Sequence, residues 1–219
     1  MIANGEPVTG DLFGETRDVR LGGGALLLKG FALAEAARLL DAVQQVAAAA
    51  PFRIMHTPGG KPMSAAMTGC GLYSWVSDRA GYRYSATDPQ TGQPWPAMPA
   101  DFLALAQSAA AAAGYPGFTP DVCLINRYEA GSRMGLHQDK DERDLSAPIV
   151  SVSLGLPMTF LWGGHKRNDR PARLLLEHGD VVVWGGPDRL RYHGVAPLKA
   201  GSHPATGACR INLTFRQAV

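Results

Sequence analysis

The sequence has few cysteines and no large excess of charge. Its 219 residues include 3 cysteines, Cys70, Cys123 and Cys209, which are widely spaced and form no Cys-x-x-Cys pair. An odd and scattered set argues against both a disulfide framework and a cysteine-based zinc site. The formal net charge of +2 is too close to neutral to indicate a nucleic-acid partner, so any basic surface must be local.

Long apolar runs are also missing. The N-terminus has no basic segment followed by an apolar stretch, and no run is long enough to span a bilayer. We therefore expect a soluble, cytoplasmic protein. The hydrophobic content of 46% is enough for a substantial core, and this length fits one large domain or two small ones.

The first half of the chain predicts two helices and a long loop. Amphipathic patterns indicate helices at residues 33–49 and 101–113. Residues 57–99 show no sustained period and many turn residues, yet their aromatic and methionine side chains are too apolar for a solvated linker. Aromatics among basic residues fit either a single-stranded nucleic-acid surface or a small local core, and composition slightly favours the core.

From about residue 119 the chain predicts short strands separated by glycine and proline. The candidate strands are 122–128, 149–154, 159–162, 173–176, 181–184, 192–195 and 209–216. Repeated short strands with turn signals indicate a sandwich or jelly roll. Strand 181–184 is followed by a turn at Gly185-Gly186-Pro187 and by a return segment that carries His193.

His137, Asp139 and His193 are candidate metal ligands. Residues two apart in an extended segment point the same way, so His137 and Asp139 can hold one ion while His193 comes from a distant strand. Two imidazoles and one carboxylate leave coordination positions open, as in non-haem Fe(II) oxygenases. The spacing alone is weak evidence, because a lone histidine is more often a hydrogen-bonded surface or core residue.

The strand-like segment Arg210–Arg216 strengthens that interpretation. Strict alternation puts Arg210, Asn212 and Arg216 on one face. Because guanidinium groups bind carboxylates bidentately, this face suggests capture of a dicarboxylate, whereas the alternative is an exposed edge strand. In strand 122–128, Asn126 and Tyr128 share a face and either present an amide and a phenol to a ligand or serve as ordinary strand residues.

These segments together resemble the AlkB family of Fe(II)- and 2-oxoglutarate-dependent dioxygenases, which dealkylate nucleic acids, and the similarity is close to the bacterial members. It is carried by Asn126-Arg127-Tyr128, Leu136-His137-Gln138-Asp139-Lys140-Asp141-Glu142, His193 and Arg210-Ile211-Asn212-Leu213-Thr214-Phe215-Arg216. It extends through Thr57-Pro58-Gly59-Gly60, Asp88-Pro89-Gln90-Thr91, Pro94-Trp95-Pro96-Ala97-Met98-Pro99 and Lys166-Arg167-Asn168-Asp169. The resemblance covers residues 51–217, and the start of the chain matches only loosely.

The resemblance implies a mainly β fold with flanking helices (α+β), a double-stranded β-helix or jelly roll with the N-terminal helices packed outside. Residues 1–219 would form a single domain with a nucleotide-recognition lid at 57–99 and a dioxygenase core at 119–219. The implied reaction is DNA repair by oxidative demethylation of N-methyl bases such as 1-methyladenine and 3-methylcytosine. It would use Fe(II), 2-oxoglutarate and O₂, and release formaldehyde, succinate and CO₂.

The resemblance also assigns site residues. The catalytic iron would be bound by His137, Asp139 and His193, and 2-oxoglutarate by Asn126, Tyr128, Arg210, Asn212 and Arg216, with Arg216 on the distal carboxylate. The substrate-binding residues would be Trp75, Tyr82, Arg83, Tyr84, Asp141 and Arg167. Trp75 would stack on the base opposite His137, and Asp141 would meet the base edge unless it only caps a turn.

We expect alkylated single-stranded DNA as the substrate of a monomer with no membrane or obligate protein partner. Duplex DNA and RNA remain alternatives, as does a related dioxygenase acting on RNA or protein. A metal-dependent isomerase or hydrolase on a cupin-like jelly roll would not need two arginines on one strand face. A non-catalytic nucleic-acid reader would not need iron ligands.

Overall fold

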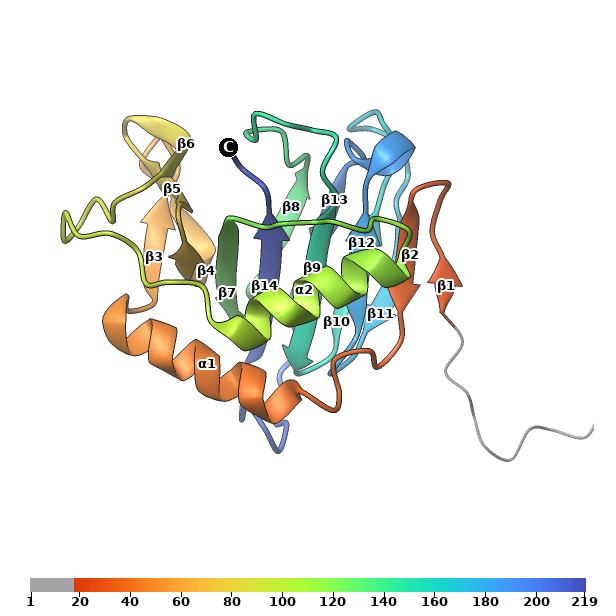
Figure 1. The fold of residues 1–219 in the computed structure, drawn as a ribbon, viewed down its shortest axis with the longest axis horizontal. Coiled ribbons are helices and arrows are strands. Elements are labelled where there is room, and N and C mark those ends of the chain that lie inside the picture. The colour runs from red at the N-terminus through yellow and green to blue at the C-terminus, as the bar shows by residue number, and fades with distance from the viewer. Residues whose placement is uncertain (1–17) are drawn as a thin grey trace, which may run out of the picture.

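Two antiparallel sheets form the body of the molecule in the computed structural model, which describes residues 18–219 (Figure 1). The large sheet is 8-stranded and runs in the order β1 (Val19–Arg20), β2 (Ala25–Leu28), β12 (Val181–Trp184), β9 (Ile149–Gly155), β14 (Arg210–Arg216), β7 (Val122–Tyr128), β4 (Pro62–Gly71) and β3 (Arg53–His56). The 4-stranded sheet runs β11 (Ala172–Leu176), β10 (Met158–Trp162), β13 (His193–Val195) and β8 (Met134–His137). The predicted jelly-roll arrangement of a mainly β protein is confirmed.

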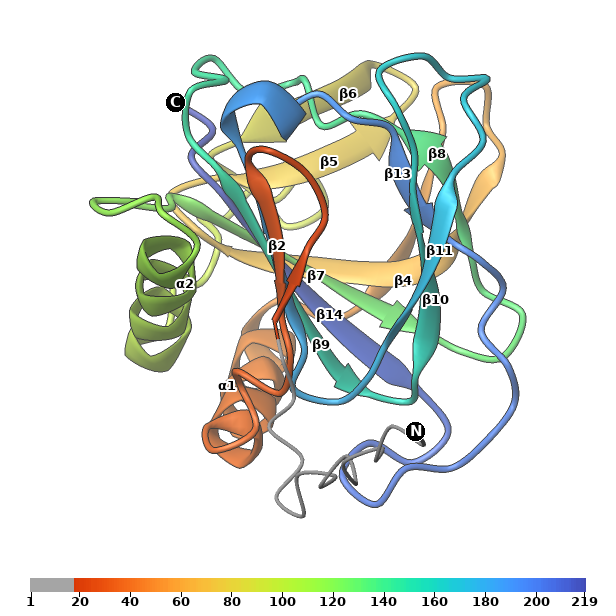
Figure 2. The ribbon, with the colours of Figure 1, turned by 90° about the vertical axis from the view of Figure 1, so that its right-hand side faces the viewer.

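Both expected helices lie against the outer face of the large sheet, as Figure 2 shows beside β7, β9 and β14. They are α1 (Ala36–Ala49) and α2 (Ala100–Ala112). The apolar stripe of α1, including Leu39 and Val43, and Phe102 of α2 join the core that the outward-facing residues of the sheet form. Helix α1 begins three residues later than its pattern predicts, because residues 30–35 turn into it from Gly30 at φ 66°. Among residues 18–219, no helix is long and apolar enough to cross a membrane.

Strand β14 lies in the middle of the large sheet, between β9 and β7. All its residues are buried, so the alternative of an exposed edge strand is wrong. Ile211, Leu213 and Phe215 face the helices and belong to the core on that side. The alternation therefore turns the two arginines of β14 inward, between the sheets, as the sequence predicts.

Residues 57–99 are not the long loop that their pattern suggests. They contain β4, which pairs with β7 in the large sheet, and a separate hairpin of β5 (Ser74–Asp78) and β6 (Gly81–Ser85). Strand β4 contains two glycines and two alanines and is mostly buried from Ala65 to Cys70, so it lacks the polar alternation that marks a half-exposed strand. The small local core exists as well, since Trp95 packs with Ala50 and Val76.

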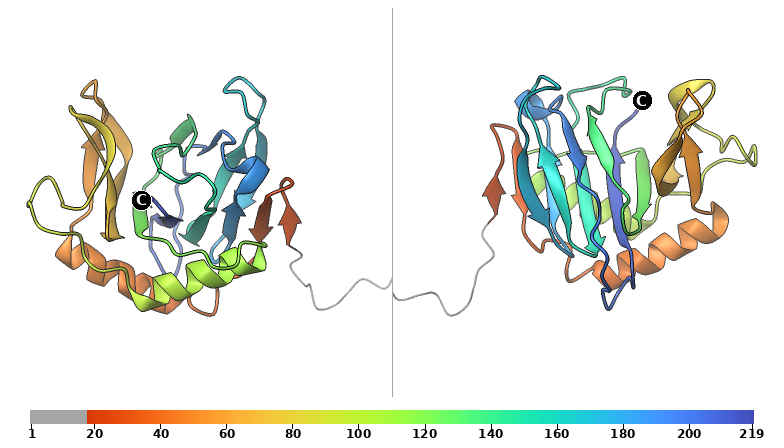
Figure 3. Two further views of the ribbon diagram at one scale, coloured as in Figure 1. Left: turned by 45° about the horizontal axis from the view of Figure 1, so that its top comes forward. Right: turned by 180° about the vertical axis from the view of Figure 1, so that it is seen from behind.

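The segment that carries His193 does not return alongside β12. Strand β12 pairs with β2 and β9, and the chain then passes through a 3-10 turn, η1 (Gly186–Asp188), to β13 in the other sheet. The expected hairpin is therefore wrong. This crossing brings His193 into register with His137, directly across the ladder between β13 and β8. Figure 3 shows the two sheets and the separate β5–β6 hairpin.

Candidate active site

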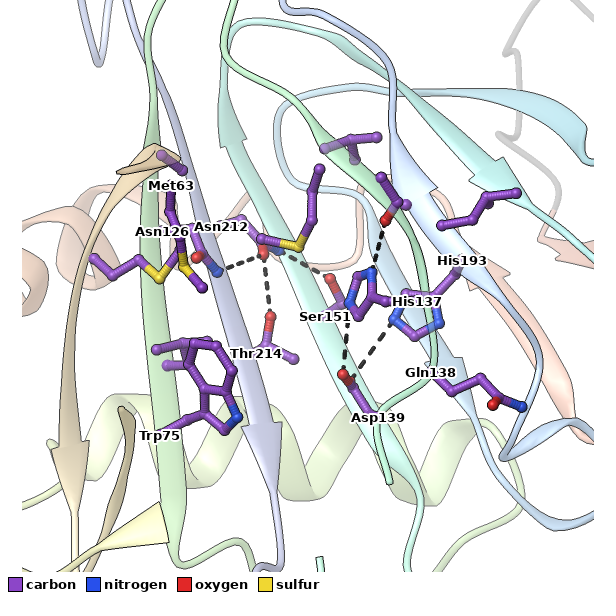
Figure 4. A pocket seen from close by; sticks show the side chains of 18 of the residues that line it. Met63, Trp75, Asn126, His137, Gln138, Asp139, Ser151, His193, Asn212 and Thr214 are labelled. Carbon is purple, nitrogen blue, oxygen red and sulfur yellow. Dashed lines mark hydrogen bonds and ion pairs between the residues drawn. The ribbon is translucent and has the colours of Figure 1, made fainter. Parts of the chain in front are cut away.

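His137, Asp139 and His193 meet at one end of the space between the sheets. His137 ends β8, Asp139 follows two residues later and His193 begins β13. Nε2 of His137 lies 3.6 Å from Oδ1 of Asp139, and Nε2 of His193 lies 3.7 Å from Oδ2. Within the described residues, this is the only cluster of three or more potential metal-ligating side chains of the His, Cys, Asp and Glu types (Figure 4).

Both imidazoles present a lone pair to the carboxylate. Nδ1 of His137 donates to the carbonyl oxygen of Gly135 at 2.9 Å, and Nδ1 of His193 donates to that of Arg191 at 3.0 Å. A carbonyl can only accept, so each Nδ1 carries a proton, and in the neutral form of each ring Nε2 is an acceptor that faces Asp139. Burial, together with His137, lowers the pKa of His193 to about 4, which keeps this ring neutral at physiological pH. Three acceptors that converge in this way suit a divalent cation.

Asp139 is held ionised by its neighbours. Burial alone would raise the pKa of its carboxyl, but the guanidinium of Arg216 outweighs this and holds the pKa well below its usual range. Nε and Nη2 of Arg216 donate to Oδ2 of Asp139 at 3.0 and 2.8 Å. The carboxylate is therefore already ionised and held in place by Arg216, ready to bind a metal.

A cavity of about 660 Å³ extends inward from this cluster, lined by the inner faces of β7, β9 and β14. Arg210 lies in its wall and is 1% exposed. Nη2 of Arg210 donates to Oγ of Ser153 at 2.9 Å, whereas its Nε and Nη1 have no partner among residues 18–219. Burial lowers the pKa of Arg210 to about 10, so the group stays charged. A buried cation with free donors requires an anionic ligand.

The other expected cosubstrate residues line the same cavity. Nδ2 of Asn126 donates to Oδ1 of Asn212 at 3.4 Å, and Nδ2 of Asn212 donates to Oγ of Ser151 at 2.9 Å (Figure 4). The ring of Tyr128 lies 5.4 Å from the guanidinium carbon of Arg210. This set of amides, a phenol and a guanidinium fits the polar groups of 2-oxoglutarate.

The two arginines of β14 occupy different parts of the cavity. Arg216 is bonded to the metal-ligand carboxylate and therefore stands at the metal end. Among residues 18–219, Arg210 contacts no metal ligand and has two donors without a partner, Nε and Nη1, whereas Arg216 has only Nη1. The geometry thus favours Arg210 over Arg216 for the distal carboxylate, which differs from the sequence-based expectation.

The mouth of the cavity is built from the β5–β6 hairpin and the loop after β8. Trp75 and Tyr82 stack, with ring centroids 5.5 Å apart and planes 14° apart, and Nε1 of Trp75 donates to Oδ2 of Asp141 at 2.9 Å. Arg167 lines the same mouth. Asp141 therefore contacts the aromatic pair on the β5–β6 hairpin, which the turn-capping alternative does not require.

The remaining two expected substrate residues point in different directions. Tyr84 lines the cavity, and its hydroxyl donates to Oε1 of Glu142 at 2.6 Å. Burial raises the pKa of Tyr84, so the phenol stays protonated. Arg83, which is not among the lining residues, pairs with Asp78 at 2.8 Å and would meet only a ligand on the outer side of the hairpin.

Several contributors were missed from the sequence. Glu142 and Arg189 are buried beside the metal ligands, Ser151 and Trp184 complete the cavity wall, and Ser153 accepts a hydrogen bond from Arg210. Serines on a strand and charges in a loop are too common to stand out by spacing. Alternation along β9 could have placed Ser151 and Ser153 on one face, but only the sheet order puts that face opposite the iron ligands.

The sequence matches the 2OG-Fe(II) oxygenase superfamily over residues 24–216. It is 60% identical to "Alpha-ketoglutarate-dependent dioxygenase AlkB" of Escherichia coli strain K12 over 95% of this chain and 97% of that protein. The chain belongs to the AlkB family.

The similarity extends to other AlkB proteins and to a solved structure. The protein of the same name from Salmonella typhimurium is 59% identical over 89% of this chain and 90% of its own length. "The structure of OsALKBH1" superposes with a TM-score of 0.80 at 30% identity, covering 92% of this chain and 100% of that one. As a member of the AlkB family, this protein is an Fe(II)- and 2-oxoglutarate-dependent dioxygenase, as expected from its sequence.

Proposed function

We propose that this AlkB-family protein repairs DNA by oxidative demethylation of N-methylated bases, with 1-methyladenine and 3-methylcytosine in single-stranded DNA as its principal substrates. The observation that carries the proposal is one continuous cavity. It joins the converging His137, Asp139 and His193 to the buried Arg210, which has no ion-pair partner among residues 18–219, at one end and to stacked aromatics at the other.

The inner part of the cavity would hold the metal and the cosubstrate. His137, Asp139 and His193 would bind Fe(II), which with 2-oxoglutarate and O₂ supplies the oxidising power that hydroxylates an N-methyl carbon. Arg210 would bind the distal carboxylate of 2-oxoglutarate, with Asn126, Tyr128 and Asn212 beside it. The closed walls around these groups exclude water from the reacting carbon.

The mouth would hold the methylated base. A base stacked in a duplex cannot reach the cavity, so it must be flipped or taken from a single strand. Trp75 would stack on one face of the base and His137 would face the other, while the carboxylate of Asp141 would meet the base edge. Carboxylate recognition favours cationic bases, and methylation at N1 of adenine or N3 of cytosine leaves the ring positively charged near neutral pH.

Basic residues around the mouth would contact the nucleic-acid backbone. Arg133, Lys140 and Arg167 all line this part of the cavity. They are too few for strong sequence-independent binding of a long duplex, which favours short contacts with a single strand. We further propose that the protein acts as a cytoplasmic monomer, since one chain supplies every group that the proposed reaction requires.

The proposal is tested by measuring formaldehyde release from matched methylated single-stranded DNA, duplex DNA and RNA. We expect release that requires Fe(II) and 2-oxoglutarate and is fastest on single-stranded DNA, with succinate formed in equal amount. Faster formaldehyde release from RNA than from DNA would show that RNA is the principal substrate. Absence of release from all three nucleic acids, with succinate still formed on adding a peptide, would instead indicate a protein substrate.

A further inference from the structure

Glu142 is a buried carboxylate at which the lid hairpin, defined as β5 and β6, meets the metal site. Its side chain is 1% exposed. Oε1 accepts the hydroxyl proton of Tyr84 from β6 at 2.6 Å and lies 3.3 Å from Nε of Arg216. Oε2 lies 3.1 Å from Nη2 of Arg189. Oε1 is hydrogen-bonded, and Oε2 is ion-paired but accepts no hydrogen bond among residues 18–219, so both oxygens lie against protein groups and not toward a base.

The two arginines that contact Glu142 also hold the metal ligand Asp139. Arg189 donates through Nη1 to the backbone oxygen of Asp139 at 2.6 Å, and through Nε to that of Ala147 at 2.9 Å. Arg216 donates through Nη2 to the Asp139 carboxylate at 2.8 Å. Asp139 is therefore fixed at both its backbone and its side chain by guanidinium groups that share one further partner.

The charges of this group balance only if Glu142 is included. Arg189 and Arg216 carry two positive charges, and Asp139 and Glu142 carry two negative ones. Without Glu142, two buried guanidinium groups would have only the carboxylate of Asp139 to balance them, and a divalent cation would have to bind beside excess positive charge. Neutral surroundings for Asp139 therefore depend on a residue that does not itself face the metal.

We propose that Glu142 is a positioning residue that couples docking of the lid hairpin to the placement of the metal ligand Asp139. The proposal rests on the iron site assigned above. With the lid docked, the Tyr84 hydroxyl fixes the Glu142 carboxylate, which in turn fixes Arg189 and Arg216 on Asp139. Nucleic acid that holds the lid in place therefore tightens metal binding, and by thermodynamic reciprocity the bound metal tightens nucleic-acid binding.

Two variants separate the parts of this coupling. Glu142→Gln keeps the length of the side chain and an acceptor for Tyr84 but removes the charge. Tyr84→Phe removes only the hydroxyl. Glu129→Gln is the matched control, because Glu129 is 69% exposed, lies 3.6 Å from Arg127 and takes no part in the cavity.

The experiment measures Mn²⁺ affinity by calorimetry in the presence of 2-oxoglutarate, with and without a methylated single-stranded oligonucleotide. In the wild type we expect the oligonucleotide to tighten Mn²⁺ binding by roughly fivefold or more. Glu142→Gln should weaken Mn²⁺ binding by about 10- to 100-fold. Tyr84→Phe should weaken DNA-free Mn²⁺ binding less than Glu142→Gln does and should abolish the tightening by the oligonucleotide, because it removes the bond that links the hairpin to Glu142. Glu129→Gln should match the wild type.

A merely structural Glu142 would lower the melting temperature without changing the effect of DNA on Mn²⁺ affinity. Unchanged tightening in Tyr84→Phe overturns the proposal even if Glu142→Gln fails to fold, and so does wild-type Mn²⁺ affinity in a folded Glu142→Gln. A wild type that binds no Mn²⁺ and releases no formaldehyde overturns the proposed function itself. A wild type that demethylates DNA but shows no tightening overturns the coupling alone.

Discussion

The inner end and the mouth of the cavity are built in different ways. At the inner end, Asn126, Tyr128 and Arg210 are 3%, 2% and 1% exposed and lie on β7 and β14. Each of these strands is hydrogen-bonded on both sides within the large sheet. At the mouth, Tyr82 is 50% exposed and lies on a hairpin of only two strands, β5 and β6.

This difference separates the part of the cavity that binds the cosubstrate from the part that selects the substrate. Groups on the central strands β7 and β14 cannot move without breaking ladders on both sides, so the cosubstrate positions are rigid. A two-stranded hairpin is marginal by itself, and side-chain bonds such as Trp75 to Asp141 hold this one over the cavity. We therefore expect changes at the inner end to abolish turnover and changes at the mouth to shift substrate preference.

The largest effect is expected from Asp139→Ala. Two imidazoles alone would hold iron weakly, and Arg216 would lose its partner beside the metal. Formaldehyde release and bound iron should both fall to background, whereas Asp41→Ala on the exposed face of α1 should retain both. Near-normal demethylation by Asp139→Ala would show that Asp139 is not an iron ligand.

The next largest effect should distinguish the two arginines of β14. Arg210→Ala removes the cavity guanidinium that has two donors without a partner among residues 18–219, which should raise the 2-oxoglutarate requirement by thirtyfold or more, equivalent to roughly 2–5 kcal/mol. Arg216→Ala should mainly weaken metal binding, because it releases Asp139. Titration of 2-oxoglutarate in both variants measures this, with the exposed Arg38→Ala as control. A larger rise in the 2-oxoglutarate requirement of Arg216→Ala than of Arg210→Ala would show that Arg216 binds the distal carboxylate.

A smaller effect should appear in the pH dependence of stability. The pKa of His193 is about 4 in the folded protein, against 6.5 for the free side chain. The unfolded chain therefore binds more protons between these values, and the contribution of His193 is complete above pH 6.5 and lost as the pH falls to 4. The loss should be about 3 kcal/mol in the metal-free protein.

Denaturant unfolding at several pH values measures this loss. His193→Asn should flatten the fall between pH 6.5 and 4, whereas His165→Asn, at an exposed position, should keep it. If the free energy of unfolding falls equally with pH in His193→Asn and in the wild type, the neutral, buried imidazole is not the source of the pH dependence.

The smallest effect is expected at the mouth, from Asp141→Asn. Loss of the carboxylate should lower kcat/KM for 1-methyladenine and 3-methylcytosine by roughly tenfold, because much of the attraction to a cationic base is offset by desolvation. The neutral 3-methylthymine in the same single strand should lose much less. An equal fall for all three bases would mean that Asp141 acts only by holding Trp75.

The sequence by itself determined the features that repeat within a few residues. The alternation of Arg210–Arg216 was enough to place both arginines on the face opposite Leu213, and β14 confirms it. Spacing paired His137 with Asp139, and helical periodicity located α1 and α2 to within a few residues. These features depend on local backbone geometry, which the order of residues fixes directly.

Only the tertiary structure decided which of these segments meet. The crossing from β12 to β13 puts His193 opposite His137, and the loop after β8 buries Glu142 between Arg189 and Arg216. Strand β4 was hidden because pairing within the sheet, and not alternation, stabilises it. The roles of Arg210 and Arg216 likewise differ only because Asp139 lies beside one of them. Contacts between segments distant in sequence depend on sheet order and register, which no local period encodes.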